Sequence, residues 1–339
     1  MTLRILKVLL WLFISVACAD EIALNPNHPE TYVVEKGDTL WDISGKFMQH
    51  PWQWPEIWHE NPQIKNPHWI YPGDELTLTY VDGKPRLTVG RPSELRLSPQ
   101  VRVSPLEQAI PTIPVNAIRQ FLTHPKVVAA GELEASPYVV AFPDDQIIGG
   151  SGDNAFVRGL VDNSQAFLVF RPGPAFKDAD TGEVLGYEAL YVGNADLVSG
   201  GDPATIVLKS TQRECLRGDR LLPVAAEKIT MNFFPHSPKK FVRGHIIGLI
   251  DGVTQIGQYQ IVIIDRGETA GIDEGTVLEI RQSGRVQRDT ISGKAEETIL
   301  LPEQRAGQLL VFKVYDKVSF GLIMSATRAL HLLDTVQQP

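Results

Sequence analysis

Residues 32–43 read YVVEKGDTLWDI, and this stretch decides the fold of the first part of the chain. The aromatic and β-branched residues at 32–34 suit a strand, and Gly37-Asp38 suits a tight turn. Thr39 is placed to cap a helix whose third position, Asp42, completes a capping box. The segment therefore predicts a strand, a turn and the start of a helix.

A second helix and a closing strand follow. Trp54-Pro55 favours a helix start, because proline in the first turn has no amide to leave unpaired, and Asn61-Pro62 favours its end. Pro72-Gly73 is a turn signal before residues 75–80, which alternate apolar and polar side chains as a half-buried strand does. The apolar face of the first helix would be formed by residues at helical spacing, Leu40, Ile43 and Phe47. The order strand, helix, helix, strand predicts a small α+β module.

This order, with GDTLW after the first strand and Asn-Pro after the second helix, resembles the LysM family of N-acetylglucosamine-binding modules. The resemblance covers residues 31–80, within a domain predicted at 27–80, and the alternative is a tryptophan-rich miniature core without a sugar site. It implies a shallow groove in which backbone groups hold the acetamide while Leu40 and Ile64 contact its methyl group. The implied peptidoglycan-binding residues are Gly37, Asp38, Thr39 and Leu40 in one loop, and Asn61, Pro62, Gln63 and Ile64 in the other. For Asp38, a purely structural role in the turn and cap is the alternative.

Residues 1–19 have the features of a cleavable signal peptide. Basic residues precede an apolar run, and Ala17-Cys18-Ala19 is a small-x-small cleavage site. A lipidated Cys18 is the alternative. The signal peptide thus predicts a secreted protein, and the family resemblance of the remainder of the chain, given below, implies a place in the periplasm, associated with peptidoglycan near the outer membrane. Removal of Cys18 would leave Cys215 alone, which excludes an internal disulfide.

The chain is acidic, with a formal net charge of -8, and 43% of its residues are apolar. A globular chain of this charge is a poor partner for nucleic acid or an anionic lipid surface. Because the module itself is rich in carboxylates, sugar binding there would have to rest on hydrogen bonds and apolar contact.

Residues 81–135 are rich in proline and predict a stiff connector with one short helix at 115–122. Beyond it, we expect a predominantly β region in two units, 136–235 and 236–339. Strands are predicted at 138–142, 166–170, 189–192, 205–208, 259–264, 276–280 and 309–314. The tetrapeptide Phe-Val-Arg-Gly occurs at 156–159 and again at 241–244. Duplication of one unit would explain this echo, and so would a chance match of four residues.

A cell-wall hydrolase is the alternative to a binding function. Zinc peptidases and amidases need histidine and carboxylate ligands at short spacing, whereas the closest histidines here are nine residues apart. Residues 149–153 (GGSGD) lack the strand-turn-helix setting of a nucleophile elbow or a phosphate loop. A pair of glycosidase carboxylates has no sequence signature. We expect no enzyme activity, no metal and no cofactor.

A second resemblance concerns the remainder of the chain. It rests on residues 98–102 (SPQVR), 109–114 (AIPTIP), 181–188 (TGEVLGYE), 218–223 (GDRLLP) and 311–320 (VFKVYDKVSF). These are similar to the LysM proteins associated with type IV pilus secretins, whose C-terminal region is similar to a flagellar T-ring component. The resemblance implies a non-enzymatic scaffold that anchors an outer-membrane secretin ring to peptidoglycan, with an oligomer templated by the secretin. A free wall-binding protein without a secretin partner is the alternative.

Overall fold

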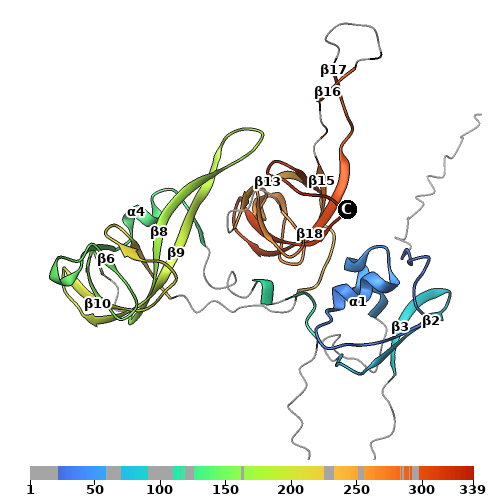
Figure 1. The fold of residues 1–339 in the computed structure, drawn as a ribbon, viewed down its shortest axis with the longest axis horizontal. Helices are drawn as coiled ribbons and strands as arrows, with labels where there is room; N and C mark the ends of the chain where they lie inside the picture. The colour runs from blue at the N-terminus through green and yellow to red at the C-terminus, as the bar shows by residue number, and fades with distance from the viewer. Residues whose placement is uncertain are drawn as a thin grey trace, which may run out of the picture.

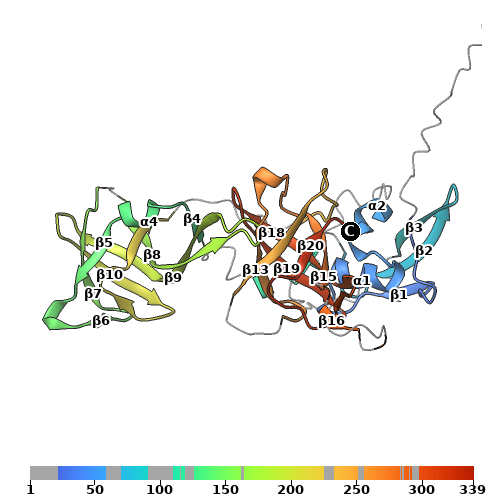
Figure 2. The ribbon, with the colours of Figure 1, turned by 90° about the horizontal axis from the view of Figure 1, so that it is seen from above.

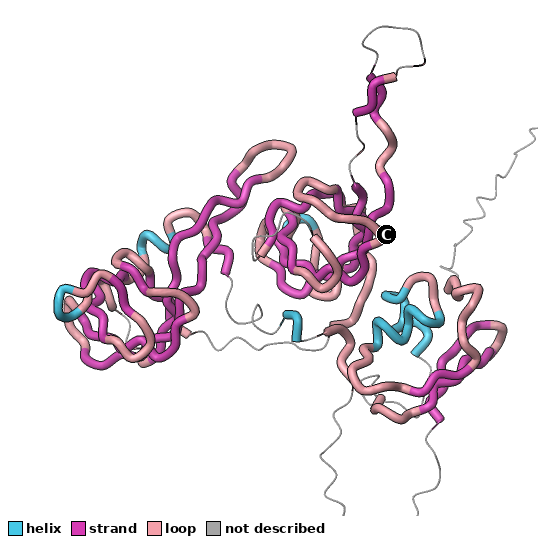
Figure 3. Tube along the Cα trace, in the orientation of Figure 1, coloured by secondary structure: helices cyan, strands magenta, loops and turns pink. Residues whose placement is uncertain are grey.

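A computed structural model describes residues 22–58, 70–90, 110–114, 116–118, 126–161, 164–224, 233–250, 256–282, 284, 286–289, 291 and 298–339. Figure 1 and Figure 2 show an N-terminal module of helices and strands, in blue, followed by two β barrels. The secondary structure in Figure 3 is mostly strand in both barrels. This is the α+β module and the predominantly β region of two units that the sequence predicts. The predicted signal peptide lies outside the described residues.

The module contains the predicted strands and helices. They are β1 (Thr31–Val33), α1 (Leu40–Phe47), η1 (Pro51–Gln53), α2 (Trp54–Trp58) and β2 (Glu75–Val81). Thr39 is the N-cap of α1, where its hydroxyl accepts from the Asp42 amide at 3.1 Å, as the capping box predicts. The apolar face of α1 is fully buried in the module core. The predicted end of the second helix, at Asn61-Pro62, lies outside the described residues.

The module also uses residues from the stretch predicted as a connector. A third strand, β3 (Lys84–Gly90), pairs antiparallel with β2, and its Leu87 is buried in the module core. Ile110 returns to the same core after the intervening chain. Residues 116–118 of the predicted short helix are helical, and the rest of that helix lies outside the described residues.

The first barrel closes through six antiparallel strands, in the order β10-β7-β5-β12-β8-β9 and back to β10. These are β5 (Tyr138–Ala141), β7 (Asn154–Arg158), β8 (Ala166–Lys177), β9 (Val184–Ser199), β10 (Ala204–Thr211) and β12 (Arg220–Pro223). β4 (Lys126–Val128) adds to β9, and β6 (Ile148–Gly149) pairs with β11 (Cys215–Leu216); α4 (Glu132–Ala135) and η2 (Pro143–Asp145) are short helices. The interior holds alternate residues of these strands, as expected for a small barrel.

The second barrel closes in the order β13-β14-β19-β18-β15-β20. These are β13 (Arg243–Leu249), β14 (Ile261–Ile264), β15 (Val277–Gln282), β18 (Gln304–Val314), β19 (Ser319–Ala326) and β20 (Thr335–Gln337). η3 (Glu268–Ala270) follows β14, and a ribbon of β16 (Val286–Arg288) and β17 (Thr298–Leu300) lies between β15 and β18. Taken in chain order, the six barrel strands of this unit have the same neighbours as the six of the first.

The two barrels also share their irregularities. The pairing of β5 with β7 shifts register after Val139, and that of β13 with β14 shifts after Ile246. The β8–β9 pairing shifts after Val169, and the β15–β18 pairing after Ile280. β-bulges are specific to a strand's place in a fold. The second unit is therefore a structural repeat of the first.

The structural repeat does not align the two Phe-Val-Arg-Gly segments, 156–159 and 241–244, with each other. Val157 in β7 pairs with Val139, and its structural counterpart is Ile264, which pairs with Ile246. Residues 156–159 thus correspond to 263–266, on the same strand of the second barrel. The tetrapeptide at 241–244 instead begins β13, one strand earlier, so the match of four residues is a coincidence within a real duplication.

Candidate functional site

The loop after β1 is a tight turn held by Asp38. Its carboxylate Oδ2 accepts from the Tyr32 hydroxyl at 2.9 Å and from the Glu35 amide at 2.9 Å. Gly37 has a φ of 106°, a left-handed conformation that glycine adopts at little cost. Burial, reinforced by the hydrogen bond to Asp38, raises the pKa of Tyr32 to about 12. Asp38 therefore has a structural role in this turn, and its contact with sugar stays a prediction.

The other two residues of this loop, Thr39 and Leu40, are buried. The Leu40 amide donates to the Pro111 carbonyl at 3.0 Å, and the Trp41 amide donates to the Thr112 carbonyl at 3.2 Å. These amides belong to the first turn of α1, where no carbonyl of the helix itself can accept from them. Residues 110–114 therefore lie against the N-terminus of α1; we call this segment the strap.

The strap is anchored at both of its ends. The Ile110 amide donates to the Ile70 carbonyl at 2.9 Å, and the Ile110 side chain is buried in the module core. Ile113 is buried in a different apolar cluster, with Trp41 and Trp52 of the module and Phe312 of the second barrel. The strap thus lies between the module and the second barrel.

The predicted second half of the groove, Asn61, Pro62, Gln63 and Ile64, lies outside the described residues. The described half is Gly37, Asp38, Thr39 and Leu40; the last two are buried, and the Leu40 amide bonds the strap. Sequence reasoning did not identify the strap. The prolines at 111 and 114 indicate an extended segment, but they carry no signal of which surface it covers.

The second barrel contacts the module directly as well. The Tyr259 hydroxyl donates to the Asp42 carboxylate at 3.1 Å, so Asp42 bonds both the cap residue Thr39 and the barrel. The rings of Trp54 and Phe234 lie 6.1 Å apart. Burial raises the pKa of Tyr259 to about 12, with a further contribution from Asp42.

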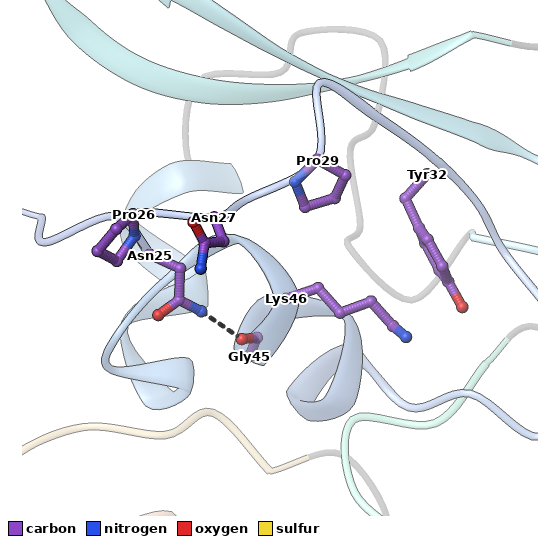
Figure 4. Close-up of a pocket in the computed structure, with 7 residues that line it drawn as sticks. All are labelled: Asn25, Pro26, Asn27, Pro29, Tyr32, Gly45 and Lys46. Carbon is purple, nitrogen blue, oxygen red and sulfur yellow. Dashed lines mark hydrogen bonds between the residues drawn. The ribbon is translucent and has the colours of Figure 1, made fainter.

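A shallow hollow of about 510 Å³ lies beside β1 and α1 of the module (Figure 4). Its lining consists of Asn25, Pro26, Asn27, Pro29, Tyr32, Gly45 and Lys46. The Asn25 side-chain amide donates to the Gly45 carbonyl at 2.7 Å, and the Lys46 ammonium lies 4.6 Å from the centre of the Tyr32 ring. Amides, an ammonium group and apolar ring faces are groups that suit a carbohydrate surface.

Comparison with known proteins identifies the module. Residues 32–79 match the family described as LysM domain. This segment is a LysM domain. A curated relative, the uncharacterized protein YqbP of Bacillus subtilis strain 168, is 43% identical over 60 residues, which are 15% of this chain and 27% of that protein. The chain thus spans about a quarter of the length of that relative, whose name supplies no activity for the barrels.

Among the described residues, no group of three or more His, Cys, Asp or Glu side chains is arranged to hold a metal ion. The Cys215 thiol is buried, and burial raises its pKa to about 12, so it is a neutral thiol at physiological pH. No helix in the described ranges is long and apolar enough to cross a membrane.

Proposed function

We propose that this protein is a cell-wall-binding scaffold whose LysM domain holds the N-acetylglucosamine-containing strands of peptidoglycan. The match of residues 32–79 to the LysM family supports this proposal most strongly. The groove would lie between residues 37–40 and residues 61–64. The hollow is lined by Tyr32, whose hydroxyl bonds Asp38 of the first of these loops, and it would accommodate further sugar of the same strand.

Glycan binding in the intact chain would require the strap to leave. The Leu40 and Trp41 amides donate to the carbonyls of Pro111 and Thr112, and a backbone carbonyl is the same functional group as the carbonyl of an acetamide. The strap therefore occupies donors that the sugar's acetamide would use. Because only the chains with a displaced strap could bind through these donors, the apparent affinity falls in proportion to that fraction.

The two barrels would supply the second half of the scaffold. We propose that they dock on an outer-membrane secretin ring in the periplasm, as the family resemblance of residues 98–320 implies, and that the protein carries no catalytic activity. Exposed strand edges and projecting ribbons are surfaces suited to protein partners. Weak single sites repeated around a ring gain strength through effective concentration, which fits anchoring under load.

The test uses the intact mature protein. It should sediment with purified peptidoglycan sacculi, bind nearly as well at moderate as at low salt, and co-purify from envelopes with a secretin. Failure to sediment would refute the wall-binding function, and wall binding without a secretin would leave a free wall-binding protein. Release of soluble glycan or peptide fragments from the sacculi would instead establish the hydrolase alternative.

A further inference from the structure

The first barrel reaches the second through a long hairpin. The outer parts of β8 and β9 and their tip, residues 178–183, project from the first barrel to the side of the second (Figure 1). We call this hairpin the first arm. Phe176 on the arm is buried in the apolar cluster that contains Phe312 of the second barrel.

Charged contacts fix the tip of the first arm. Asp178 pairs with Arg266 at 2.9 Å, and Glu183 pairs with Lys317 at 2.6 Å. The Ala179 amide donates to the buried carboxylate of Asp265 at 3.3 Å. An acidic tip therefore lies in a socket of the second barrel that contains two cations.

The second barrel has an arm of its own at the equivalent place. The first arm lies between the register shift after Val169 and Gly193, and the ribbon of β16 and β17 lies between the shift after Ile280 and Gly307. This second arm, β16 and β17, projects away from the barrel (Figure 1). Its apolar side chains are exposed, Val286 by 69% and Leu300 by 73%. The second barrel therefore has an equivalent arm, but the apolar side chains of that arm are exposed instead of covered by a socket.

The first barrel carries the surface that corresponds to the socket. Arg158 is equivalent to Asp265, because each directly follows one of the equivalent residues Val157 and Ile264. Asp202 is equivalent to Lys317, because each lies at the same interval before its strand, β10 or β19. Val198 is equivalent to Phe312. Each is the extra residue of a β-bulge, Val198 in the pairing of β9 with β10 and Phe312 in the pairing of β18 with β19. Phe312 is 1% exposed, whereas Val198 is 59% exposed. The same position is thus covered on the second barrel and open on the first.

The two sockets differ in charge as the two arms do. On the first barrel, Arg158 and Asp202 pair with each other at 3.1 Å, so their charges cancel beside the exposed Val198. That surface matches an apolar arm rather than an acidic one. In the socket of the second barrel, Arg266 pairs with Asp265 and Lys317 adds one further positive charge, which suits the acidic first arm, so the two contacts would not compete for the same partner.

We propose that the second arm of one copy of this chain docks on the first barrel of the next copy, at the surface around Val198, Arg158 and Asp202. The contact repeats between chains what the first arm does within one chain. Each copy offers one arm and one socket, which is a heterologous interface, so copies add head to tail into a ring or an open filament. The proposal goes beyond wall binding and does not depend on it.

The test is the association state of the intact mature chain, followed by sedimentation velocity over a range of concentrations. The parent should self-associate. Leu300→Asp in the arm and Val198→Asp in the socket should each weaken association about tenfold or more, because each places a charge in an apolar contact. Both side chains are exposed in the single chain, so neither change removes core packing. The matched control is Ile147→Asp, at an exposed apolar position outside the arm and the socket, and it should associate as the parent does.

Mixing the two variants separates this geometry from others. The Leu300→Asp chain retains a socket and the Val198→Asp chain retains an arm, so an equimolar mixture should form a complex of two chains and stop there. A parent that stays monomeric would overturn the proposal. So would a mixture without the two-chain complex, or a Val198→Asp variant that associates as the parent does, because the arm would then not seat on the first barrel.

Discussion

The Leu40 amide, in the loop that we propose to bind sugar, donates its hydrogen bond to the Pro111 carbonyl 3.0 Å away. The neighbouring Trp41 amide does the same with Thr112. Two unpaired donors at a helix N-terminus are thus satisfied by the chain itself. The segment that satisfies them also packs against the second barrel, through Ile113. Access to the proposed groove would therefore depend on the contact between the module and the second barrel.

Loosening the strap from the barrel should strengthen wall binding. Ile113→Asp would place a charge in the apolar cluster between the module and the barrel, while Ile110 would still complete the module core. The binding of this variant to sacculi should rise several-fold, as the population with free Leu40 and Trp41 amides increases. Co-sedimentation measures it, with hydrogen exchange of those two amides as the direct readout. Unchanged exchange and weaker binding would mean that the strap supports the groove rather than covers it.

Two tyrosines, Tyr32 of the module and Tyr259 of the second barrel, should titrate late. The pKa of Tyr32 and that of Tyr259 are each raised to about 12 from an ordinary 10.0, mainly by burial and further by Asp38 and Asp42. Folding favours the neutral phenol, so this stabilisation is complete below pH 10 and is lost as the pH rises towards 12. Tyrosinate absorbance should show a fraction that ionises near pH 12 and that decreases in Tyr259→Phe. Titration of all tyrosines near pH 10 in the folded chain would contradict it.

Much of the module follows from local sequence signals. Thr39 caps α1, Asp42 completes the cap, and residues 75–80 form the strand that their alternation predicts. These features depend on neighbours within a few residues, which a single sequence contains. The strap does not, because its contacts use the backbone carbonyls of Pro111 and Thr112, and any residue has a carbonyl.

The sequence could suggest that one unit is duplicated, but it could not show which residues of the two units correspond. The repeat is preserved in strand order and in bulges, whereas interior side chains vary freely provided that they remain apolar, as Ala155 and Val262 do at one equivalent position. A fold can keep its backbone pattern when only apolar character and volume are retained. The echo at 156–159 and 241–244 therefore misled, since short identities are not what the repeat conserves.

One pair of equivalent glycines should be indispensable in both barrels. A Cβ on Gly193 would lie 2.3 Å from the Ser210 carbonyl oxygen, and a Cβ on Gly307 would lie 2.3 Å from that of Ser325. Since backbone is on both sides, Gly193→Ala and Gly307→Ala should each destabilise their own barrel by about 1–3 kcal/mol. Chemical unfolding measures the loss. Gly200→Ala is the control, because its Cβ would meet nothing within 4 Å; equal losses at all three positions would remove close packing as the cause.

The contact of the first arm should rest on Arg266 far more than on Lys317. Arg266 pairs at 3.2 Å with the buried carboxylate of Asp265 and donates to Asp178 of the arm, whereas Lys317 and Glu183 are both exposed. Removing one partner of a buried pair leaves a charge without compensation, so Arg266→Ala should cost about 3 kcal/mol. Lys317→Ala should cost much less, because this lysine is exposed, and that small loss should vanish in high salt.

Limited proteolysis at the tip, residues 178–183, together with chemical unfolding, compares the two variants. The Arg266→Ala chain should be cleaved there much faster than the parent, and the Lys317→Ala chain at nearly the parental rate. Equal protection of all three chains would mean that the apolar cluster around Phe176 holds the arm by itself and that the ion pairs add only orientation.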